Sequence, residues 1–194
     1  MKYATIAAAV IAATAGVAHA VDYDEAVGGD LSGDRLNPDA FTLDLGANTF
    51  RMDTVNANDF VNGDIDYFSV TIPTGLQLDS IILNESSAPM GGDNRAFIGL
   101  AFGDIMPVDP MFPDPSQLTG FVITDTSQVG SDILFELNGF TPGPIVGEQT
   151  LTFWVQQTGQ DLTTLDLTFN VAIPAPGAAA LFGLAGLAAT RRRR

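Results

Sequence analysis

The chain has 194 residues, no cysteine, and a formal net charge of −15 that arises from 23 acidic and eight basic residues. Without cysteine it forms no disulfide and no thiolate site, so its stability must come from packing or from bound ions. The single histidine, His19, and the single lysine, Lys2, lie in the first twenty residues. The rest of the chain therefore cannot form a Ser-His-Asp catalytic triad, a zinc site built on His or Cys, or a lysine Schiff base.

Residues 1–20 have the pattern of a secretory signal peptide. Lys2 gives a positive start, residues 4–17 are apolar and uncharged, and Ala18, His19 and Ala20 form a small-x-small cleavage site. The alternative is a buried Ala-rich helix. We predict cleavage after Ala20, which removes the only His and Lys and leaves the body outside the cytoplasm.

The body of the chain is strongly acidic. Between residues 21 and 190, three arginines accompany 23 acidic residues, for a net charge of −20. This charge repels nucleic acid and anionic lipid, and it suits divalent cations or simply a solvated surface. We therefore expect no nucleic-acid partner.

Residues 21–171 are expected to form one all-β domain. Short segments in which every second residue is apolar alternate with Gly, Pro, Asn and Asp clusters, as is typical of an antiparallel sandwich or barrel. The clearest strand is 64–73, where Phe68, Val70 and Ile72 share one face. A turn after this strand and a return strand over 76–84 predict a hairpin.

Further strands are expected at residues 41–45, 48–52, 95–102, 120–124, 133–137, 150–157 and 162–171. Residues 103–117, which include four prolines, and residues 141–147 are expected to be loops. About eight or nine strands predict a two-sheet β-sandwich.

An Asx-rich segment over residues 56–66 is a candidate Ca²⁺ site. Its oxygen-bearing side chains are Asp59, Asn62, Asp64 and Asp66. The candidates to complete the shell from the N-terminal segment are Asp30, Asp34 and Asp24. Ca²⁺ takes six to eight oxygen ligands, and Gly63 permits a tight bend. Asp66 shares strand parity with Phe68, at the rim of the core, where an unpaired carboxylate is costly. The alternative is an ordinary Asx-rich turn.

Trp154 is a second candidate site. It shares a strand face with polar residues, including Gln156, opposite an apolar face. A Trp in such surroundings predicts a sugar-stacking platform, with Trp154 and Gln156 as ligand-binding residues. The alternative is a Trp covered by a loop or buried against the second sheet.

Residues 172–194 form a distinct tail. Pro174, Ala175 and Pro176 precede an apolar, uncharged run over residues 178–190. The chain ends in Arg191, Arg192, Arg193 and Arg194. The run of 13 residues is short of the ~20 that a spanning helix needs, and the arginines would stay cytoplasmic by the positive-inside rule. A permanent single-pass anchor is one interpretation.

The tail resembles the PEP-CTERM sorting signal of Gram-negative bacteria, in which a Pro-Glu-Pro motif precedes a short apolar helix and a basic end. Ala175 replaces the usual Glu. The resemblance implies a short C-terminal transmembrane helix, transient anchoring in the inner membrane, recognition by an exosortase, and delivery to the cell surface or extracellular polysaccharide matrix.

The body resembles a pre-peptidase C-terminal-like domain. The resemblance rests on DLSGDRL (30–36), FTLDLGANTF (41–50), DIDYFSVTIPTGLQL (64–78) and TFWVQQTG (152–159). It implies a jelly-roll-like β-sandwich, an accessory role, and, as in some members, binding of calcium and of polymers such as collagen or polysaccharide.

Three functions remain open. The first is an exported, non-catalytic surface or matrix protein, Ca²⁺-stabilised and associated with exopolysaccharide in a biofilm. The second is a purely structural envelope protein without a specific ligand. The third is a carboxylate-dependent polysaccharide hydrolase, which needs only two suitably spaced acids. We expect no enzyme, because few catalytic groups remain and acidic pairs arise by chance among 23 acids.

Overall fold

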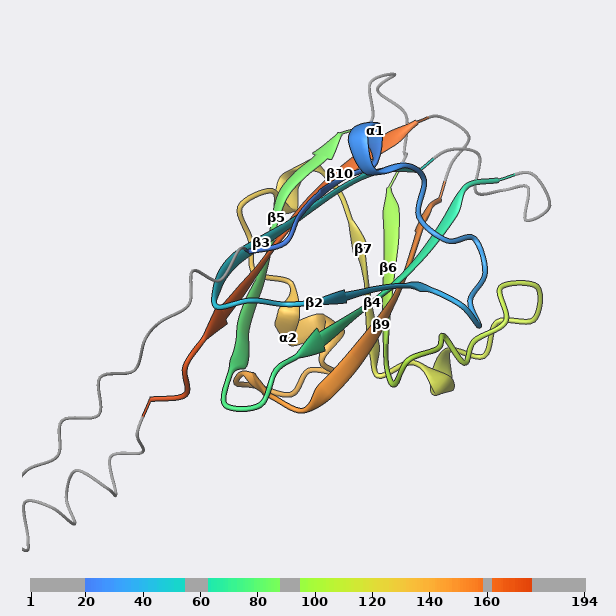
Figure 1. The fold of residues 1–194 in the computed structure, drawn as a ribbon. Coiled ribbons are helices and arrows are strands. Elements are labelled where there is room, and N and C mark those ends of the chain that lie inside the picture. The colour runs from blue at the N-terminus through green and yellow to red at the C-terminus, as the bar shows by residue number, and fades with distance from the viewer. Residues whose placement is uncertain (1–19, 55–62, 88–94, 159–161, 176–194) are drawn as a thin grey trace, which may run out of the picture.

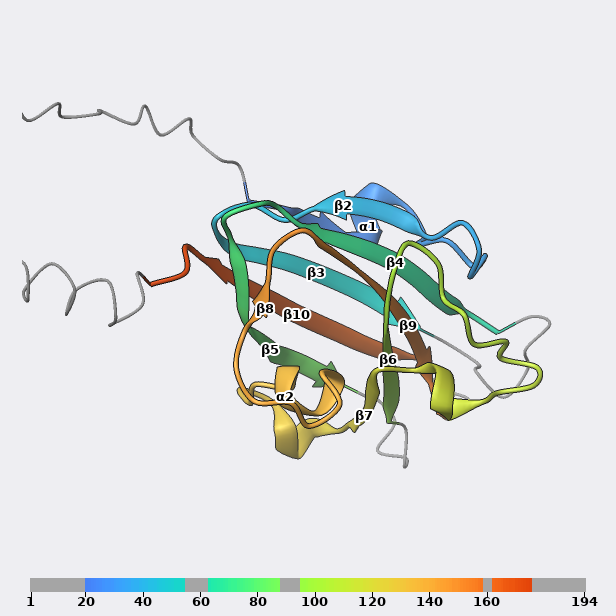
Figure 2. The same cartoon turned by 90° about the horizontal axis from the view of Figure 1, so that it is seen from below.

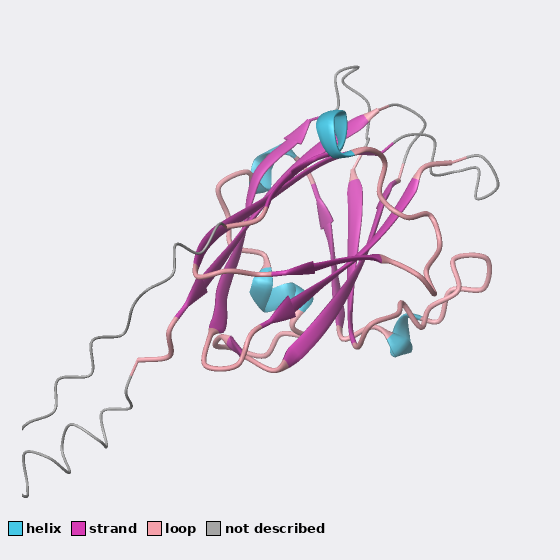
Figure 3. Ribbon diagram, viewed as in Figure 1, coloured by secondary structure: helices cyan, strands magenta, loops and turns pink. Residues whose placement is uncertain are grey.

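The computed structural model describes residues 20–54, 63–87, 95–158 and 162–175 (Figure 1). Within these ranges, strands form two five-stranded sheets that face each other, so the predicted all-β sandwich is confirmed (Figure 3). We name each sheet after its central strand.

The β10 sheet has the order β1-β3-β10-β5-β8. Its strands are β1 (Asp22–Asp24), β3 (Gly46–Thr54), β10 (Thr163–Ala172), β5 (Gln77–Ser87) and β8 (Ile145–Val146). The β9 sheet has the order β2-β4-β9-β6-β7. Its strands are β2 (Asp39–Thr42), β4 (Ile65–Ile72), β9 (Gln149–Gln157), β6 (Ala96–Phe102) and β7 (Gly120–Thr124). Two of the pairings, β1 with β3 and β2 with β4, are parallel, and the others are antiparallel.

The main core lies between the two sheets and is built by alternation along the strands. Phe68 stacks on Phe50 of the facing sheet at a centroid distance of 5.1 Å and on Phe153 of its neighbour strand at 4.9 Å. Phe169 of β10 packs edge-on against Phe153. The predicted inward face of residues 68, 70 and 72 is confirmed, because all three lie in this core.

A second, smaller apolar cluster covers the outer face of the β9 sheet. The proline-rich segment 103–117 folds over this face and inserts Met106 and Val108 against Tyr67 and Trp154. The segment is held by Arg35, whose Nη1 donates to the Met106 carbonyl at 3.1 Å. The predicted loop is confirmed, apart from one 3₁₀ turn, η1 (Pro115–Gln117).

The helices are short. They are α1 (Glu25–Gly28), α2 (Leu134–Leu137) and the two 3₁₀ turns η1 and η2 (Thr126–Gln128). In the described ranges, none of them has the length and apolar character needed to cross a membrane. The predicted signal and tail helices lie outside the described residues.

The hairpin predicted between residues 64–73 and 76–84 is wrong. β4 belongs to the β9 sheet and β5 to the β10 sheet, so the turn at Pro73–Gly75 carries the chain from one sheet to the other. Both strands turn their apolar faces to the same core. Alternation along each strand is therefore the same for a hairpin and for a connection across the sandwich.

The strand predicted at residues 133–137 is also wrong, because this segment forms α2. Ile133, Leu134 and Leu137 are buried while Phe135 is exposed, a spacing that fits one face of a helix. The Asp132 carboxylate accepts from the Leu134 N–H at 3.0 Å and holds the first turn. Two short strands, β1 and β8, were not predicted, so the described sheets contain ten strands rather than eight or nine.

Candidate metal centre

Glu25 opens the helix α1 and is fixed by backbone groups. Asp24 caps this helix by accepting from the Ala26 N–H at 2.9 Å, which sets the direction of the first turn. The Glu25 Oε1 atom accepts from the Leu31 N–H at 3.2 Å, and Oε2 accepts from the Asp53 N–H at 2.6 Å. These bonds hold the carboxylate between the N-terminal segment and the end of β3.

Asp66 is the second residue of β4 and points to the interior, in line with Phe68. It is 0% exposed, and neither carboxylate oxygen accepts a hydrogen bond from any described residue. Burying an uncharged polar group without a hydrogen bond costs on the order of 2–7 kcal/mol, and burying an unpaired charge costs more. Burial, reinforced by the acids around it, raises the pKa of Asp66 to about 10. This carboxylate needs either a proton or a cation.

The carboxylates of Glu25, Asp30 and Asp66 come together at this point, with one oxygen from each lying within 4.8 Å of the others. Ca²⁺–oxygen distances of 2.3–2.6 Å place opposite ligands roughly 4.6–5.2 Å apart. The three oxygens are thus close enough to share one ion. Oxygen-only ligands suit a hard cation such as Ca²⁺.

The electrostatics of the cluster also favour a cation. Burial raises the pKa of Glu25 to about 7 against the effect of its two backbone hydrogen bonds, and nearby Asp64 and Asp30 add to the rise. Burial and the charge of Asp30 raise the pKa of Asp64 to about 6. Every charged neighbour that shifts the pKa of Asp66 is an acid. A divalent cation would relieve this repulsion.

The predicted metal ligands have three different outcomes. Asp30 and Asp66 meet in the cluster as predicted, while Asp64 is close enough to raise the pKa of Asp66 without belonging to the three-oxygen group. Asp59 and Asn62 lie outside the described residues. Of the alternatives, Asp24 caps α1 and Asp34 accepts from the Leu36 N–H at 2.9 Å, so each carboxylate is engaged locally.

Glu25 is the ligand candidate that the sequence did not reveal. It lies in an acidic run, directly after its capping residue, and nothing in that run distinguishes one carboxylate from the next. Its place in the cluster depends on the parallel pairing of β1 with β3, after which Glu25 lies beside Asp53. The pairing is long-range and leaves no local signal.

Trp154 lies where the alternative interpretation placed it, under a loop. It is 4% exposed, packs edge-on against Phe97 at 4.9 Å, and donates from Nε1 to the Gln156 Oε1 atom at 3.1 Å. Val108 of the proline-rich segment belongs to the same cluster. Trp154 and Gln156 nevertheless both line a pocket of about 290 Å³ whose other lining residues are apolar. The stacking platform at these two residues therefore stays a prediction.

The predicted processing sites lie mostly outside the described residues. These are Ala18, Pro176 and the four terminal arginines. Ala20 is exposed, two residues before the start of β1, and Pro174 and Ala175 follow β10 without regular structure.

In comparisons with known proteins, the chain matches no family model, and neither a curated protein nor a solved structure is significantly similar to it. The resemblances to the PEP-CTERM signal and to the pre-peptidase C-terminal-like domain therefore stay predictions.

Proposed function

We propose that the protein is an exported, non-catalytic β-sandwich of the cell surface or extracellular matrix, stabilised by Ca²⁺ and associated with exopolysaccharide. The observation that carries the proposal is the buried Asp66 carboxylate, which no described residue hydrogen-bonds, beside Glu25 and Asp30. A chain without cysteine gains no stability from disulfides outside the cytoplasm, so an ion takes over that role.

The chemistry of the cluster supports a structural ion in preference to acid-base catalysis. Asp66 is fully buried, so a polymeric substrate cannot reach its oxygens. Glu25 and Asp30 come from the N-terminal segment, whereas Asp66 comes from β4 of the other sheet. A cation shared by these side chains ties the N-terminal segment to the sandwich. Extracellular Ca²⁺ modules work with dissociation constants of about 10⁻⁴–10⁻³ M, which suits the millimolar Ca²⁺ of an exterior.

The finer architecture belongs to the same proposal. We propose a jelly-roll-like arrangement of the sandwich, a signal peptide over residues 1–20, and a C-terminal transmembrane helix that an exosortase recognises. The acidic body and the terminal arginines support this orientation, because basic residues stay on the cytoplasmic side.

Thermal unfolding of the body in Ca²⁺ and in EDTA tests the ion. Ca²⁺ at a hundred times its Kd stabilises by about 2.7 kcal/mol, which raises Tm by roughly 5–10 °C for a body of this size. Asp66→Asn should abolish this rise and leave Tm in EDTA no lower than that of the wild type. Asp104→Asn, at an exposed acid, is the matched control and should keep the full response. Equal melting of the wild type in Ca²⁺ and EDTA would sink the proposal.

Fractionation of cells that produce the protein, with sequencing of its N-terminus, tests the proposed localisation. The expected result is a protein in the surface or matrix fraction whose N-terminal residue is Val21. Recovery in the cytoplasm with residues 1–20 attached would contradict export.

A further inference from the structure

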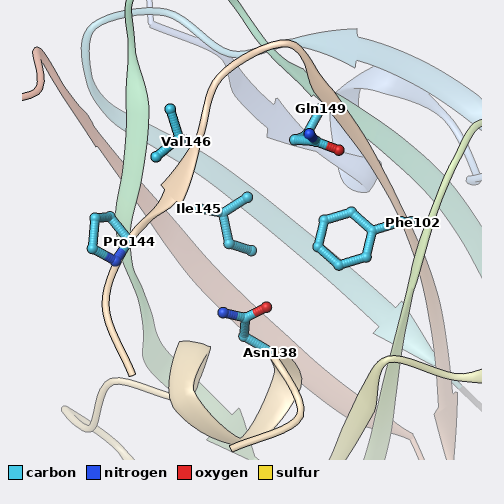
Figure 4. A pocket seen from close by; sticks show the side chains of 6 residues that line it. All are labelled: Phe102, Asn138, Pro144, Ile145, Val146 and Gln149. Carbon is cyan, nitrogen blue, oxygen red and sulfur yellow. The ribbon is translucent and has the colours of Figure 1, made fainter. Parts of the chain in front are cut away.

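A pocket of about 350 Å³ lies beside α2, away from the acidic cluster. Its lining residues are Phe102, Asn138, Pro144, Ile145, Val146 and Gln149. Figure 4 shows the amides of Asn138 and Gln149 at opposite ends of the pocket, with Ile145 and the Phe102 ring between them. In Figure 2, α1 and α2 lie on opposite sides of the molecule, and the pocket shares no lining residue with the Glu25 cluster.

The lining combines an apolar floor with uncharged polar ends. Phe102 is the last residue of β6 and is 46% exposed, so its ring is open to a ligand. A carboxamide offers both donors and acceptors. The Asn138 amide donates to the Thr141 carbonyl at 3.3 Å and keeps its oxygen open, and the Gln149 side chain has no hydrogen bond within the described ranges.

The backbone around the pocket is held in an unusual conformation. Phe140 (φ 58°) and Glu148 (φ 64°) are the two non-glycine residues with positive φ in the described chain. Phe140 is two residues from Asn138, and Glu148 directly precedes Gln149. Both are fixed by neighbouring backbone, since the Glu148 N–H donates to the Ile72 carbonyl at 2.9 Å and the Phe140 N–H to the Phe135 carbonyl at 2.9 Å. Such conformations concentrate at functional sites, where they aim particular side chains.

These features select the chemistry of the ligand. No lining side chain is charged, and the acidic body repels polyanions. A neutral sugar presents apolar C–H faces and hydroxyl groups that need both donors and acceptors, which matches an aromatic ring between two carboxamides. The volume is at the lower end of the range of ~300–1,000 Å³ for small-ligand sites, as suits one sugar unit.

A second pocket of about 190 Å³ shares the lining residue Pro144 with the first. It contains the half-exposed ring of Phe135 and the carboxylates of Asp79 and Asp132. Carboxylate oxygens are suitable acceptors for the hydroxyl groups of a sugar. Two adjoining pockets suit consecutive units of a chain.

We propose that the pocket between Asn138 and Gln149 binds a neutral glycan, with one sugar unit on Phe102 and Ile145 and the next beside Phe135. This proposal rests on the association with exopolysaccharide proposed above and names the surface that makes the contact. It places sugar recognition at the α2 end of the sandwich, in a pocket that does not include Trp154.

Native affinity electrophoresis in gels that contain dextran, hydroxyethylcellulose or galactomannan tests the proposal, with alginate as the anionic polymer and Ca²⁺ present throughout. We expect at least one neutral polymer to retard the wild type and alginate to leave it unaffected. Phe102→Ala and Gln149→Ala should each weaken the retarding interaction by about tenfold. Phe112→Ala, at an exposed ring outside the pocket, is the matched control. Melting curves identify any variant whose loss of binding reflects unfolding, and the exposed Gln149 is the safer substitution.

The outcomes separate this proposal from the one on which it rests. Retardation that survives in both pocket variants overturns the pocket and leaves the polysaccharide association intact. Retardation by alginate alone overturns the assignment of a neutral ligand. If no polymer retards the wild type, the pocket and the polysaccharide association both fall, whereas the Ca²⁺ response is judged separately by melting.

Discussion

The Glu25 carboxylate, fixed by the backbone N–H groups of Leu31 and Asp53, comes within 4.8 Å of the Asp66 carboxylate, which accepts no hydrogen bond from the described part of the chain. One carboxylate is thus oriented by the backbone and the other is left to an external partner. Without a cation that partner is a proton, so the stability of the protein should depend on pH in a defined direction.

The first prediction concerns pH in the absence of Ca²⁺. The folded pKa values of Glu25, about 7, and Asp66, about 10, lie above the ordinary values near 4. The folded state therefore binds more protons than the unfolded state above pH 4, and stability falls as pH rises through this window. For each extra proton that the folded state binds, the free energy of unfolding falls by about 1.4 kcal/mol per pH unit. In EDTA, Tm should fall between pH 5 and pH 8, and Ca²⁺ should protect more at pH 8 than at pH 5.

Substitution of the buried acid isolates its part of this pH dependence. Asp66→Asn carries no proton equilibrium at that position, so its Tm in EDTA should exceed that of the wild type at pH 8 by more than at pH 5. Asp104→Asn should keep the wild-type slope, because its side chain is exposed. Parallel slopes for Asp66→Asn and the wild type would contradict the proton-filled cluster.

The second prediction uses Trp154, the single tryptophan of the chain. Its ring is covered by the proline-rich segment, so native emission should be blue-shifted and weakly quenched by acrylamide, and both should change on unfolding. Trp154→Ala should lower the free energy of unfolding by about 3–5 kcal/mol. Native emission as red as that of the unfolded chain would show that the ring is open.

The third prediction concerns the aromatic stack across the core. Phe68 contacts rings in both sheets, so Phe68→Ala should cost about 3–5 kcal/mol in urea unfolding, and Phe68→Leu should cost less because it leaves a smaller cavity. Phe112→Ala removes a ring that is 81% exposed and should stay within about 0.5 kcal/mol of the wild type. Similar losses for the alanine variants of Phe68 and Phe112 would refute the proposed core.

The fourth prediction concerns a close backbone contact. A Cβ atom at Gly147 would lie 2.2 Å from the Pro73 carbonyl oxygen and 2.7 Å from that of Leu76, so Gly147→Ala must displace the turn between the sheets. We expect a loss of about 1–3 kcal/mol in chemical denaturation. Gly33→Ala is the control, because its nearest atom would be 3.8 Å away and its φ is not in the left-handed region. A neutral Gly147→Ala would show that the turn is free to shift.

The inward and outward faces of the strands were predictable, whereas their partners were not. Alternation placed Asp66 on the same face as Phe68, and this parity made Asp66 a ligand candidate. The same alternation does not say in which sheet a strand lies, so β4 and β5 were predicted to pair although they face each other across the core. Partner choice depends on long-range backbone pairing, which short apolar segments do not encode.

The acidic cluster of Glu25, Asp30 and Asp66 was likewise predictable only in part. Asp30 and Asp66 were predicted from oxygen chemistry and from the cost of a buried carboxylate, but Glu25 was missed because its position depends on the docking of β1 against β3. The apolar residues at positions 133–137 fit either a strand or a single turn of helix, and in the structure they form the helix α2. The Asp132 carboxylate, which accepts from both Ile81 and Leu134 N–H groups, provides the tertiary contact that favours it.

The last strand of the described chain is the central strand of its sheet, and this sets the order of assembly. β10 pairs with both β3 and β5, yet it begins 76 positions after the end of β5 at Ser87. At synthesis rates of roughly 5–20 residues per second, β5 waits about 4–15 s, and β3 waits longer, before the strand between them exists. The β10 sheet therefore cannot close before residues 163–172 have been synthesised, and a chain shortened before this strand would leave the facing edges of β3 and β5 without their partner.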